Sequence, residues 1–397
     1  MVYLTREQEK MLNGEHGEII ERMMRLLVRL ADIYNADKMI PIGSAQIAGV
    51  SYKSIGDPGL EFLEDMADKG AKVRVLSYLN PAGMDMMQWR DLGFSEDFAK
   101  KQICIMDAFQ KMGIVISATC TPYLAGNLPR YREHIAWSES SAVSFANSVI
   151  GARTNREGGP SALAAAICGI TPNYGLHLDE NREPNVLINV EAKLEHQSDY
   201  GALGYTVGKL VKNKIPLFRG IPDNVDTDQL KSLGAAMAAS GAVALYHVEN
   251  ITPDADKVNK NGLEKITITD EDLRETYEKL NTGDNPDIII IGCPHASIRE
   301  IKRIADKLQG KKVRKPLWIC TSRVIRDLAE KIGLLDVIEK AGANIVADTC
   351  MVVAPIEKMG YKTTAVNSGK AANYLPGFCK QNVVFQNIDE LVRRAMQ

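Results

Sequence analysis

The chain has 397 residues, enough for two or three domains. Hydrophobic residues make up 45% and charged residues 25%, which is typical of a globular protein and excludes a disordered, collagen-like or coiled-coil chain. The 48 basic and 50 acidic side chains leave a net charge of −2, so we expect no nucleic-acid partner and no membrane. No signal peptide or spanning segment is recognisable, and the odd number of cysteines, seven, favours a reducing cytoplasm.

The first third of the chain alternates between predicted helices and strands. Thr5 and Gln8 form a capping-box pattern that opens a helical segment. The pattern then predicts strands over 38–42, 72–79 and 114–120, and helices over 59–70 and 95–113. We expect Cys104, in the second of these helices, to pack in the core. Such alternation is typical of an α/β domain with parallel strands.

The rest of the chain continues this alternation in two further parts. A Gly-rich polar loop from residue 152 leads into a helix of small residues, and more strands and helices follow. A polar stretch over 252–287 predicts a domain boundary. After it, apolar runs end in small or polar residues in IIIIGCPH, WICTS, ANIVADTC and TTAVNSG. We therefore expect α/β domains over 1–150, 151–285 and 286–397.

Three cysteines follow predicted strands, at the positions where ligands bind in open α/β sheets. Cys120, Cys293 and Cys350 are too far apart in the sequence for a local zinc knuckle. Three thiolates from separate loops can hold an iron–sulfur cluster and leave one iron open to a substrate. Two alternatives remain at this point: buried structural cysteines, and Cys320, which occupies a similar strand end, as a rival ligand.

Loops of small residues at other strand ends suit an anion. Their backbone N–H groups point outward at turns and helix starts, and lysines add positive charge. One such turn, Asn-Ser-Gly-Lys, lacks the P-loop pattern, and no GxGxxG follows a strand, so a nucleotide cofactor is disfavoured. Ordinary strand-to-helix turns are the alternative. The candidate anion-binding residues are Gly49, Val50, Ser51, Lys53, Gly369 and Lys370, and we expect Asn80 and Pro81, after the next strand, to line the same crevice.

Further polar residues suit acid–base work or substrate binding. Glu139 is a candidate acid or base, and Ser140 a candidate helix cap or catalytic group. Asn155 and Arg156 precede a helix, and a guanidinium group can bind a carboxylate with two hydrogen bonds. His295 lies close enough in sequence to a candidate cysteine to support it. Simple capping and a solvated loop are the alternative explanations.

Longer motifs resemble the aconitase X family over nearly the whole chain. They are LTREQEKMLNGEHGE, IPIGSAQIAGVSYKSIGDPGLEFLEDMA, SATCTPY, GARTNREGGPSA, IGCPHAS, ADTCMVVAP and NSGKAANYLPG. The resemblance implies an aconitase-like catalytic core of several α/β domains with largely parallel sheets. It also implies an iron–sulfur cluster, of the [4Fe-4S] type with one open iron, held by Cys120, Cys293 and Cys350.

The resemblance further implies a hydro-lyase of an archaeal mevalonate pathway. Its substrate would be (R)-5-phosphomevalonate, and its product trans-anhydromevalonate 5-phosphate. Residues 49–51, 80–81, 139–140 and 369–370 would line the substrate pocket, with Ser368 in support. The chain ends at Gln397, soon after the last motif, so we expect a small subunit to bring the swivelling domain that supplies the serine base in aconitase-like enzymes.

Two other functions are open at this stage. The large subunit of a cis-3-hydroxyproline dehydratase belongs to the same family, and the motifs define the family better than the substrate. A binding or scaffold subunit with structural cysteines is the non-enzymatic alternative, and it predicts no bound iron.

Overall fold

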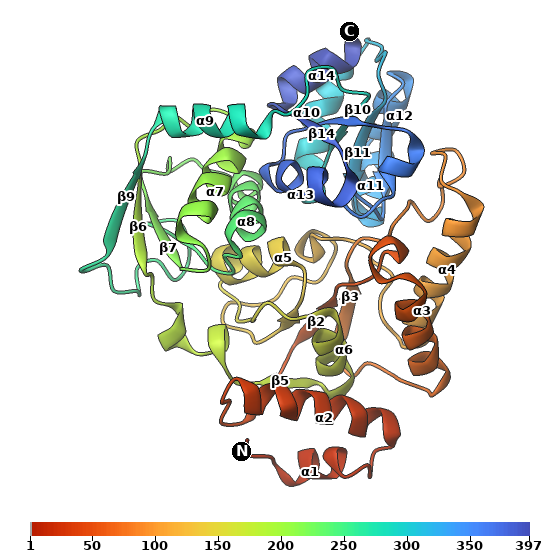
Figure 1. Cartoon of the computed structure of the whole chain (residues 1–397), viewed down its shortest axis with the longest axis vertical. Coiled ribbons are helices and arrows are strands. Elements are labelled where there is room, and N and C mark those ends of the chain that lie inside the picture. The colour runs from red at the N-terminus through yellow and green to blue at the C-terminus, as the bar shows by residue number, and fades with distance from the viewer. Residues whose placement is uncertain (1) are drawn as a thin grey trace.

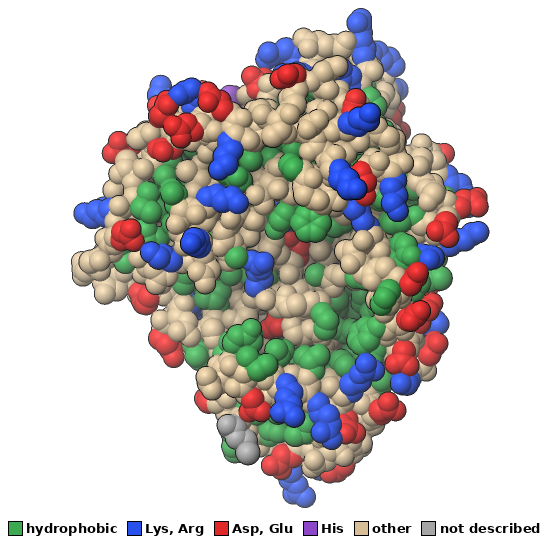
Figure 2. All heavy atoms as spheres, in the orientation of Figure 1, with side chains coloured by type: hydrophobic (Ala, Val, Ile, Leu, Met, Phe, Trp, Pro, Cys, Tyr) green, Lys and Arg blue, Asp and Glu red, His purple; other side chains and the backbone are tan. Residues whose placement is uncertain are grey.

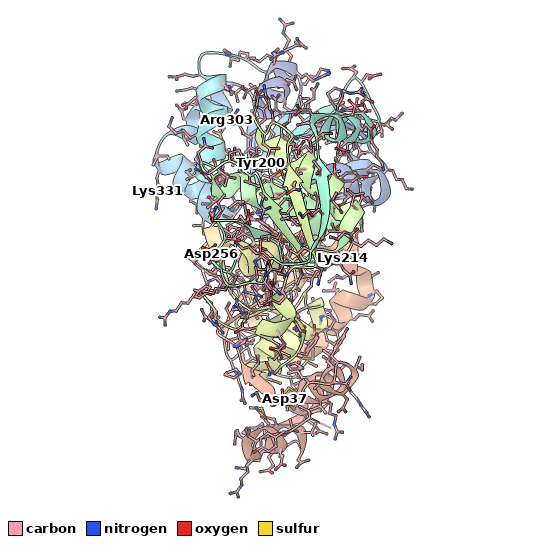
Figure 3. The ribbon with its side chains drawn as sticks, turned by 90° about the vertical axis from the view of Figure 1, so that its left-hand side faces the viewer. Asp37, Tyr200, Lys214, Asp256, Arg303 and Lys331 are labelled. Atoms are coloured by element: carbon pink, nitrogen blue, oxygen red, sulfur yellow. The ribbon has the colours of Figure 1, made fainter. Side chains whose placement is uncertain are left out.

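The structure is a computed structural model that describes residues 2–397. Three regions, over 2–182, 186–280 and 288–397, each surround a parallel sheet (Figure 1). Figure 3 shows Asp37 of the first region towards the lower end of the molecule, Lys214 of the second near the middle, and Arg303 of the third towards the upper end. Within these described residues, no helix has the length and apolar character needed to cross a bilayer.

The first region is built on the parallel sheet β3-β2-β4, below which lie the N-terminal helices. The capping box of Thr5 and Gln8 is confirmed at the start of the first helix. The elements are α1 (Arg6–Leu12), α2 (Glu18–Ile33), β1 (Met39–Pro41), β2 (Ser44–Ile47), α3 (Tyr52–Asp68), β3 (Leu76–Leu79), α4 (Glu96–Lys111), η1 (Pro122–Leu124), β4 (Ala136–Trp137), α5 (Ser140–Phe145), η2 (Ala146–Ile150), α6 (Gly159–Cys168), β5 (Ile170–Pro172), η3 (Gly175–His177) and η4 (Asp179–Arg182).

Three local expectations differ from the structure here. The predicted strand over 114–120 contributes only a bridge between Val115 and Tyr78, because a positive φ of 39° at Ala118 interrupts the pairing before the N–H of Thr119 bonds to Leu79. Cys104 is exposed, because the apolar stripe of α4 runs through Ile105 and Met106 on its other side. The segment over 151–172, expected in the middle domain, joins the first region, where β5 pairs antiparallel with β1.

The second region has the parallel order β8-β7-β6-β9. The polar stretch over 252–287 is more than a boundary, because it contains a strand whose five residues all pair with β6 and a helix that follows it. Its polarity reflects the exposed edge position of that strand. The elements are β6 (Val186–Val190), α7 (Gln197–Val211), β7 (Pro216–Arg219), α8 (Thr227–Gly241), β8 (His247–Val248), β9 (Glu264–Ile268) and α9 (Asp270–Leu280).

The third region has the parallel order β12-β11-β10-β13-β14. The chain builds outward from β10 in one direction and then returns to its other side, which places a crevice at the carboxyl ends of the central strands. The elements are β10 (Ile288–Ile291), α10 (Ile298–Leu308), β11 (Leu317–Thr321), α11 (Arg323–Lys331), α12 (Leu334–Lys340), β12 (Asn344–Ala347), η5 (Ile356–Met359), β13 (Thr363–Val366), α13 (Gly369–Cys379), β14 (Asn382–Phe385) and α14 (Ile388–Met396).

The second and third regions share one hydrophobic core, and α13 packs against α7 and α8. This contact needs glycine, because a Cβ on Gly369 would lie 2.5 Å from the carbonyl oxygen of Gly201. The face seen in Figure 2 is hollowed where α3, α5 and α13 approach one another in Figure 1, and hydrophobic side chains gather around the hollow. The expected α/β fold with largely parallel sheets is confirmed.

Candidate active site

A cavity of about 590 Å³ lies between the first and third regions. Its walls come from the start of α3, the loops after β3, β4, β10 and β12, and one face of α13. The concave shape, the thiols and the charged side chains together mark it as the candidate active site. It is lined by Gly49, Lys53, Ser54, Ile55, Asn80, Pro81, Cys120, Glu139, Ser140, Cys293, Cys350, Val352, Val353, Lys370, Tyr374 and Phe378.

The three candidate cysteines meet in this cavity. Cys293 follows β10, Cys350 follows β12, and Cys120 comes from the loop before η1 in the first region. All three are buried. Burial raises the pKa of the Cys120 thiol to about 12. A hydrogen bond with the Cys293 thiol lowers the pKa of Cys350 to about 7, helped by nearby backbone N–H groups and opposed by burial. The rival Cys320 is buried in β11 and does not line the cavity.

One buried histidine links the segments that carry these cysteines. The Nε2 of His295 lies 3.0 Å from the carbonyl oxygen of Thr349, which can only accept, so Nε2 carries the proton. Nδ1 then accepts a hydrogen bond from the hydroxyl of Thr119 at 2.9 Å. The backbone N–H of His295 donates to Sγ of Cys120 at 3.2 Å. Burial lowers the pKa of His295 to about 4, which fits this neutral form.

A buried ion pair forms the charged part of the cavity wall. Lys370, near the start of α13, donates to Oε1 of Glu139 and, at 3.1 Å, to Oγ of Ser141. Burial opposes the charge of Lys370, but Glu139 and the neighbouring cysteines raise its pKa well above the usual value. Burial also opposes the charge of Glu139, whose pKa is nevertheless lowered by Lys370, Ser141 and the N–H of Ala142. Both groups are therefore charged at neutral pH.

The start of α3 fastens the loop that carries Cys350. The Nζ of Lys53 donates to the carbonyl oxygen of Ala354 at 3.0 Å, to Oε2 of Glu357 at 2.9 Å and to Sγ of Cys379 at 3.3 Å. Nearby, Oγ of Ser51 donates to the carbonyl oxygen of Val353 at 2.9 Å. The expected anion ligand Lys53 thus lines the cavity with all three of its N–H donors engaged.

The remaining predicted site residues line the cavity, lie next to lining residues or lie outside the cavity. Gly49, Asn80, Pro81 and Ser140 line the cavity, whereas Val50, Ser51 and Gly369 lie next to lining residues. The cap of α5 is Glu139 rather than Ser140, and the hydroxyl of Ser368 caps α13.

Asn155 and Arg156 are not brought into the cavity. The side chain of Asn155 bonds to the backbone of Tyr174 and Leu176, and Arg156 is exposed. This loop holds the 174–176 turn in place instead of facing the cysteines.

The residues around the thiols fit an iron–sulfur cluster. Soft thiol donors suit iron and sulfide. Buried oxygens without a hydrogen-bond partner among the described residues lie beside them: Oγ1 of Thr349, the hydroxyl of Tyr123 and Oδ1 of Asn80. No group of three or more His, Cys, Asp or Glu side chains in residues 2–397 is arranged to hold a single metal ion. An iron–sulfur cluster is larger than a single ion because it contains its own sulfide, so its thiol ligands lie further apart.

Several residues around this site were missed by sequence reasoning. Behind the Cys293 loop, Lys231 contacts Asp228, Glu300 and the carbonyl oxygen of His295. Beside the Cys350 loop, Arg323 contacts two aspartates. These partners come from different regions and form no motif. The only available signal was the presence of charged residues inside otherwise apolar or small-residue segments.

Comparisons with known proteins identify the family of the chain. Family models for the aconitase X first, second and third domains match residues 1–180, 184–278 and 286–397. The phosphomevalonate dehydratase large subunit of Methanocaldococcus jannaschii is 59% identical, over 99% of this chain and 100% of that protein. The cis-3-hydroxy-L-proline dehydratase of Pseudomonas aeruginosa is 35% identical, over 98% of this chain and 69% of that protein.

A solved structure is similar over the same extent. The crystal structure of Thermococcus kodakaraensis aconitase X in its holo-form superposes with a TM-score of 0.94 at 49% identity, covering 99% of this chain and 100% of that one. The expected family is thus confirmed by its three domain models, by relatives above 30% identity and by a common fold. The chain belongs to the aconitase X family.

Proposed function

We propose that this chain is the large subunit of a phosphomevalonate dehydratase, a hydro-lyase that removes water from (R)-5-phosphomevalonate to give trans-anhydromevalonate 5-phosphate. The observation that carries the proposal is one cavity in which three buried thiols meet a protonated lysine. The full-length similarity to relatives of that name supports the choice of reaction.

The chemistry needs an anion site, help for a departing hydroxyl and a base. An iron–sulfur cluster on Cys120, Cys293 and Cys350, of the [4Fe-4S] type, would supply a Lewis acid for the hydroxyl and a carboxylate oxygen. Lys370 has used two N–H donors within the described residues, so its third can bind an anionic oxygen of the substrate. The free Oδ1 of Asn80 can accept a hydrogen bond from a hydroxyl group.

Glu139 is poorly suited to be the base. Its carboxylate is held by Lys370, Ser141 and the N–H of Ala142, and its lowered pKa makes it a weak proton acceptor. Its role is to hold Lys370 in place. We therefore propose that the base comes from a small subunit that covers the cavity, as the words "large subunit" in the names of the relatives suggest.

The hydroxyproline reaction is the weaker candidate. Relatives named for it are 35% and 30% identical, and this chain spans about two thirds of their length. Relatives named for phosphomevalonate reach 59% and 53% identity and are spanned almost completely. We also propose a cytoplasmic enzyme, because all seven cysteines are free.

The test is an anaerobic assay of this chain with its small subunit. The complex should dehydrate (R)-5-phosphomevalonate, while unphosphorylated mevalonate and cis-3-hydroxyproline should react far more slowly. The large chain alone should show no turnover. Faster reaction of cis-3-hydroxyproline would replace the proposed substrate, and an iron-free complex with no activity on any of them would favour the scaffold alternative.

A further inference from the structure

We infer that Arg323 is a positioning residue, which fixes the Cys350 loop of the third region against the Asn80–Pro81 wall of the first. This inference rests on the proposed cluster site. Arg323 begins α11 and does not line the cavity. Its Nη2 donates to Oδ1 of Asp85 at 2.6 Å and to Oδ2 of Asp348 at 2.5 Å.

Asp85 and Asp348 belong to different regions, so this guanidinium bridges their interface. Asp85 is fully buried in the loop after β3 and is 262 residues away in sequence from Ala347, whose N–H donates to its Oδ2 at 2.8 Å. In the other direction, the N–H of Ala82 donates to the carbonyl oxygen of Asp348 at 2.8 Å. The N–H of Met86 donates to Oδ2 of Asp348 at 3.3 Å. The two loops are therefore joined by side chains and backbone together.

Both joined loops contribute to the wall of the cavity. Cys350 lies two residues after Asp348, and Asn80 and Pro81 lie shortly before Asp85. Asp348 also has a positive φ of 67°, a backbone conformation that a residue with a side chain adopts at a cost and that its contacts must maintain. Two carboxylates facing one guanidinium have no other cation within ion-pair distance among the described residues. Removing Arg323 would leave two like charges buried side by side.

A charge-balancing role alone would make a different prediction from a positioning role. If Arg323 only neutralised the two carboxylates, a variant that lacks Arg323 and has both aspartates replaced by asparagine would behave as wild type. If it positions the loops, the planar guanidinium is needed to reach both aspartates at once, and neither lysine nor charge removal would replace it.

The experiment compares Arg323→Met, Arg323→Lys and the triple variant D85N/R323M/D348N with wild type, each as the complex with the small subunit, purified anaerobically. Arg326→Met is the matched control, because Arg326 lies one turn later on α11, is similarly buried and, among residues 2–397, pairs only within the third region, with Glu330 and Glu339. The readouts are iron per chain, the half-time of iron loss to a chelator, the electron paramagnetic resonance spectrum of the reduced cluster, kcat and KM, and the melting temperature.

We expect Arg323→Met, Arg323→Lys and the triple variant to lose iron faster and to fall in kcat, each on the order of 10- to 100-fold, with a changed spectrum. Arg326→Met should stay within about twofold of wild type in iron content, iron loss, kcat and KM, and its spectrum should match that of wild type. Recovery of wild-type iron retention and spectrum in the triple variant would overturn the inference, as would a lowered melting temperature with no change in retention or spectrum. If wild type itself bound no iron, the proposed function would fail first, which separates the two failures.

Discussion

Two buried lysines flank the candidate site, and they differ in how many of their donors are engaged. Lys231 lies behind the Cys293 loop and contacts Oδ1 of Asp228, Oε2 of Glu300 and the carbonyl oxygen of His295. Lys370 lies in the cavity wall and contacts only Glu139 and Ser141 among the described residues. A lysine has three N–H donors, so Lys231 has none left and Lys370 has one.

The difference separates a structural lysine from one available to a ligand. Lys231 faces two carboxylates and holds the second region against the third, while Lys370 faces one carboxylate and an open cavity. In both, burial would lower the pKa, but the carboxylates around them raise it, so both stay protonated. Lys53 resembles Lys231 in this respect, because its three donors also have partners.

The largest expected effect is the loss of stability in Lys231→Met. Among the described residues, Glu300 would be left buried without its cation and Asp228 would keep only Arg299, which costs about 3–5 kcal/mol of unfolding free energy. Chemical unfolding of the isolated chain measures this. Lys370→Met should cost less, about 1–3 kcal/mol, because Lys370 pairs with one buried carboxylate whereas Lys231 pairs with two. A smaller loss for Lys231→Met than for Lys370→Met would contradict the comparison.

The second effect is on catalysis and concerns Lys370. Its charge-assisted bond to an anionic substrate is worth about 2–3 kcal/mol, so Lys370→Met should lower kcat/KM by about 30- to 150-fold. The assay uses complexes with the small subunit at equal iron loading. Lys311→Met, on the exposed surface, is the control and should leave kcat/KM unchanged. Equal values for the two variants would remove Lys370 from the reaction.

The third effect concerns Lys53 and tests whether the number of engaged donors decides function. Its pair with Glu357 is partly exposed, so Lys53→Met should cost about 1 kcal/mol or less in stability. Because its donors are engaged, the variant should lower kcat/KM by less than Lys370→Met does. If Lys53→Met raised KM for (R)-5-phosphomevalonate more than Lys370→Met, Lys53 would be the anion ligand, as the sequence first suggested.

The smallest effect is a pH dependence of stability from Glu139. Its folded-state pKa is lowered from 4.5, so its ionised form stabilises the fold above about pH 4.5 and this contribution is lost as pH falls through the folded value. The difference in unfolding free energy between wild type and Glu139→Gln should therefore be constant from pH 7 to 5 and shrink below. A difference that grew on acidification would show the opposite shift.

Much of the fold and part of the site could be predicted from the sequence. The apolar run of β10 and the small residues after the strands predicted parallel strands. They also predicted that Cys293 and Cys350 lie together at the carboxyl ends of these strands. The pairing of Lys370 with Glu139 could not be predicted, because the two residues are 231 positions apart and are brought together by α5 and α13 both packing against α8. The same holds for Arg323, whose partners come from two regions.

Local sequence patterns gave wrong predictions where a single residue changed the backbone conformation, where a residue lay off the buried face of its helix, and where a polar loop had a structural role. The run over 114–120 has the composition of a strand, but the positive φ of Ala118 interrupts its pairing, and Cys120 at its end lines the cavity. In α4, Cys104 is surrounded in sequence by apolar residues, yet it does not lie on the buried face of the helix and is exposed. The loop of Asn155 and Arg156 has the polarity of a binding loop, but it supports a neighbouring turn.

The central claim is that Cys120, Cys293 and Cys350 hold an iron–sulfur cluster beside Lys370. The most direct measurement is iron and sulfide per chain in anaerobically purified Cys→Ala variants at each of these positions. Cys320→Ala is the control, since Cys320 is equally buried in the adjacent strand but does not line the cavity. The account predicts loss of the cluster in all three variants and retention in the control. Wild-type iron and sulfide in Cys350→Ala, or their loss in Cys320→Ala alone, would contradict it.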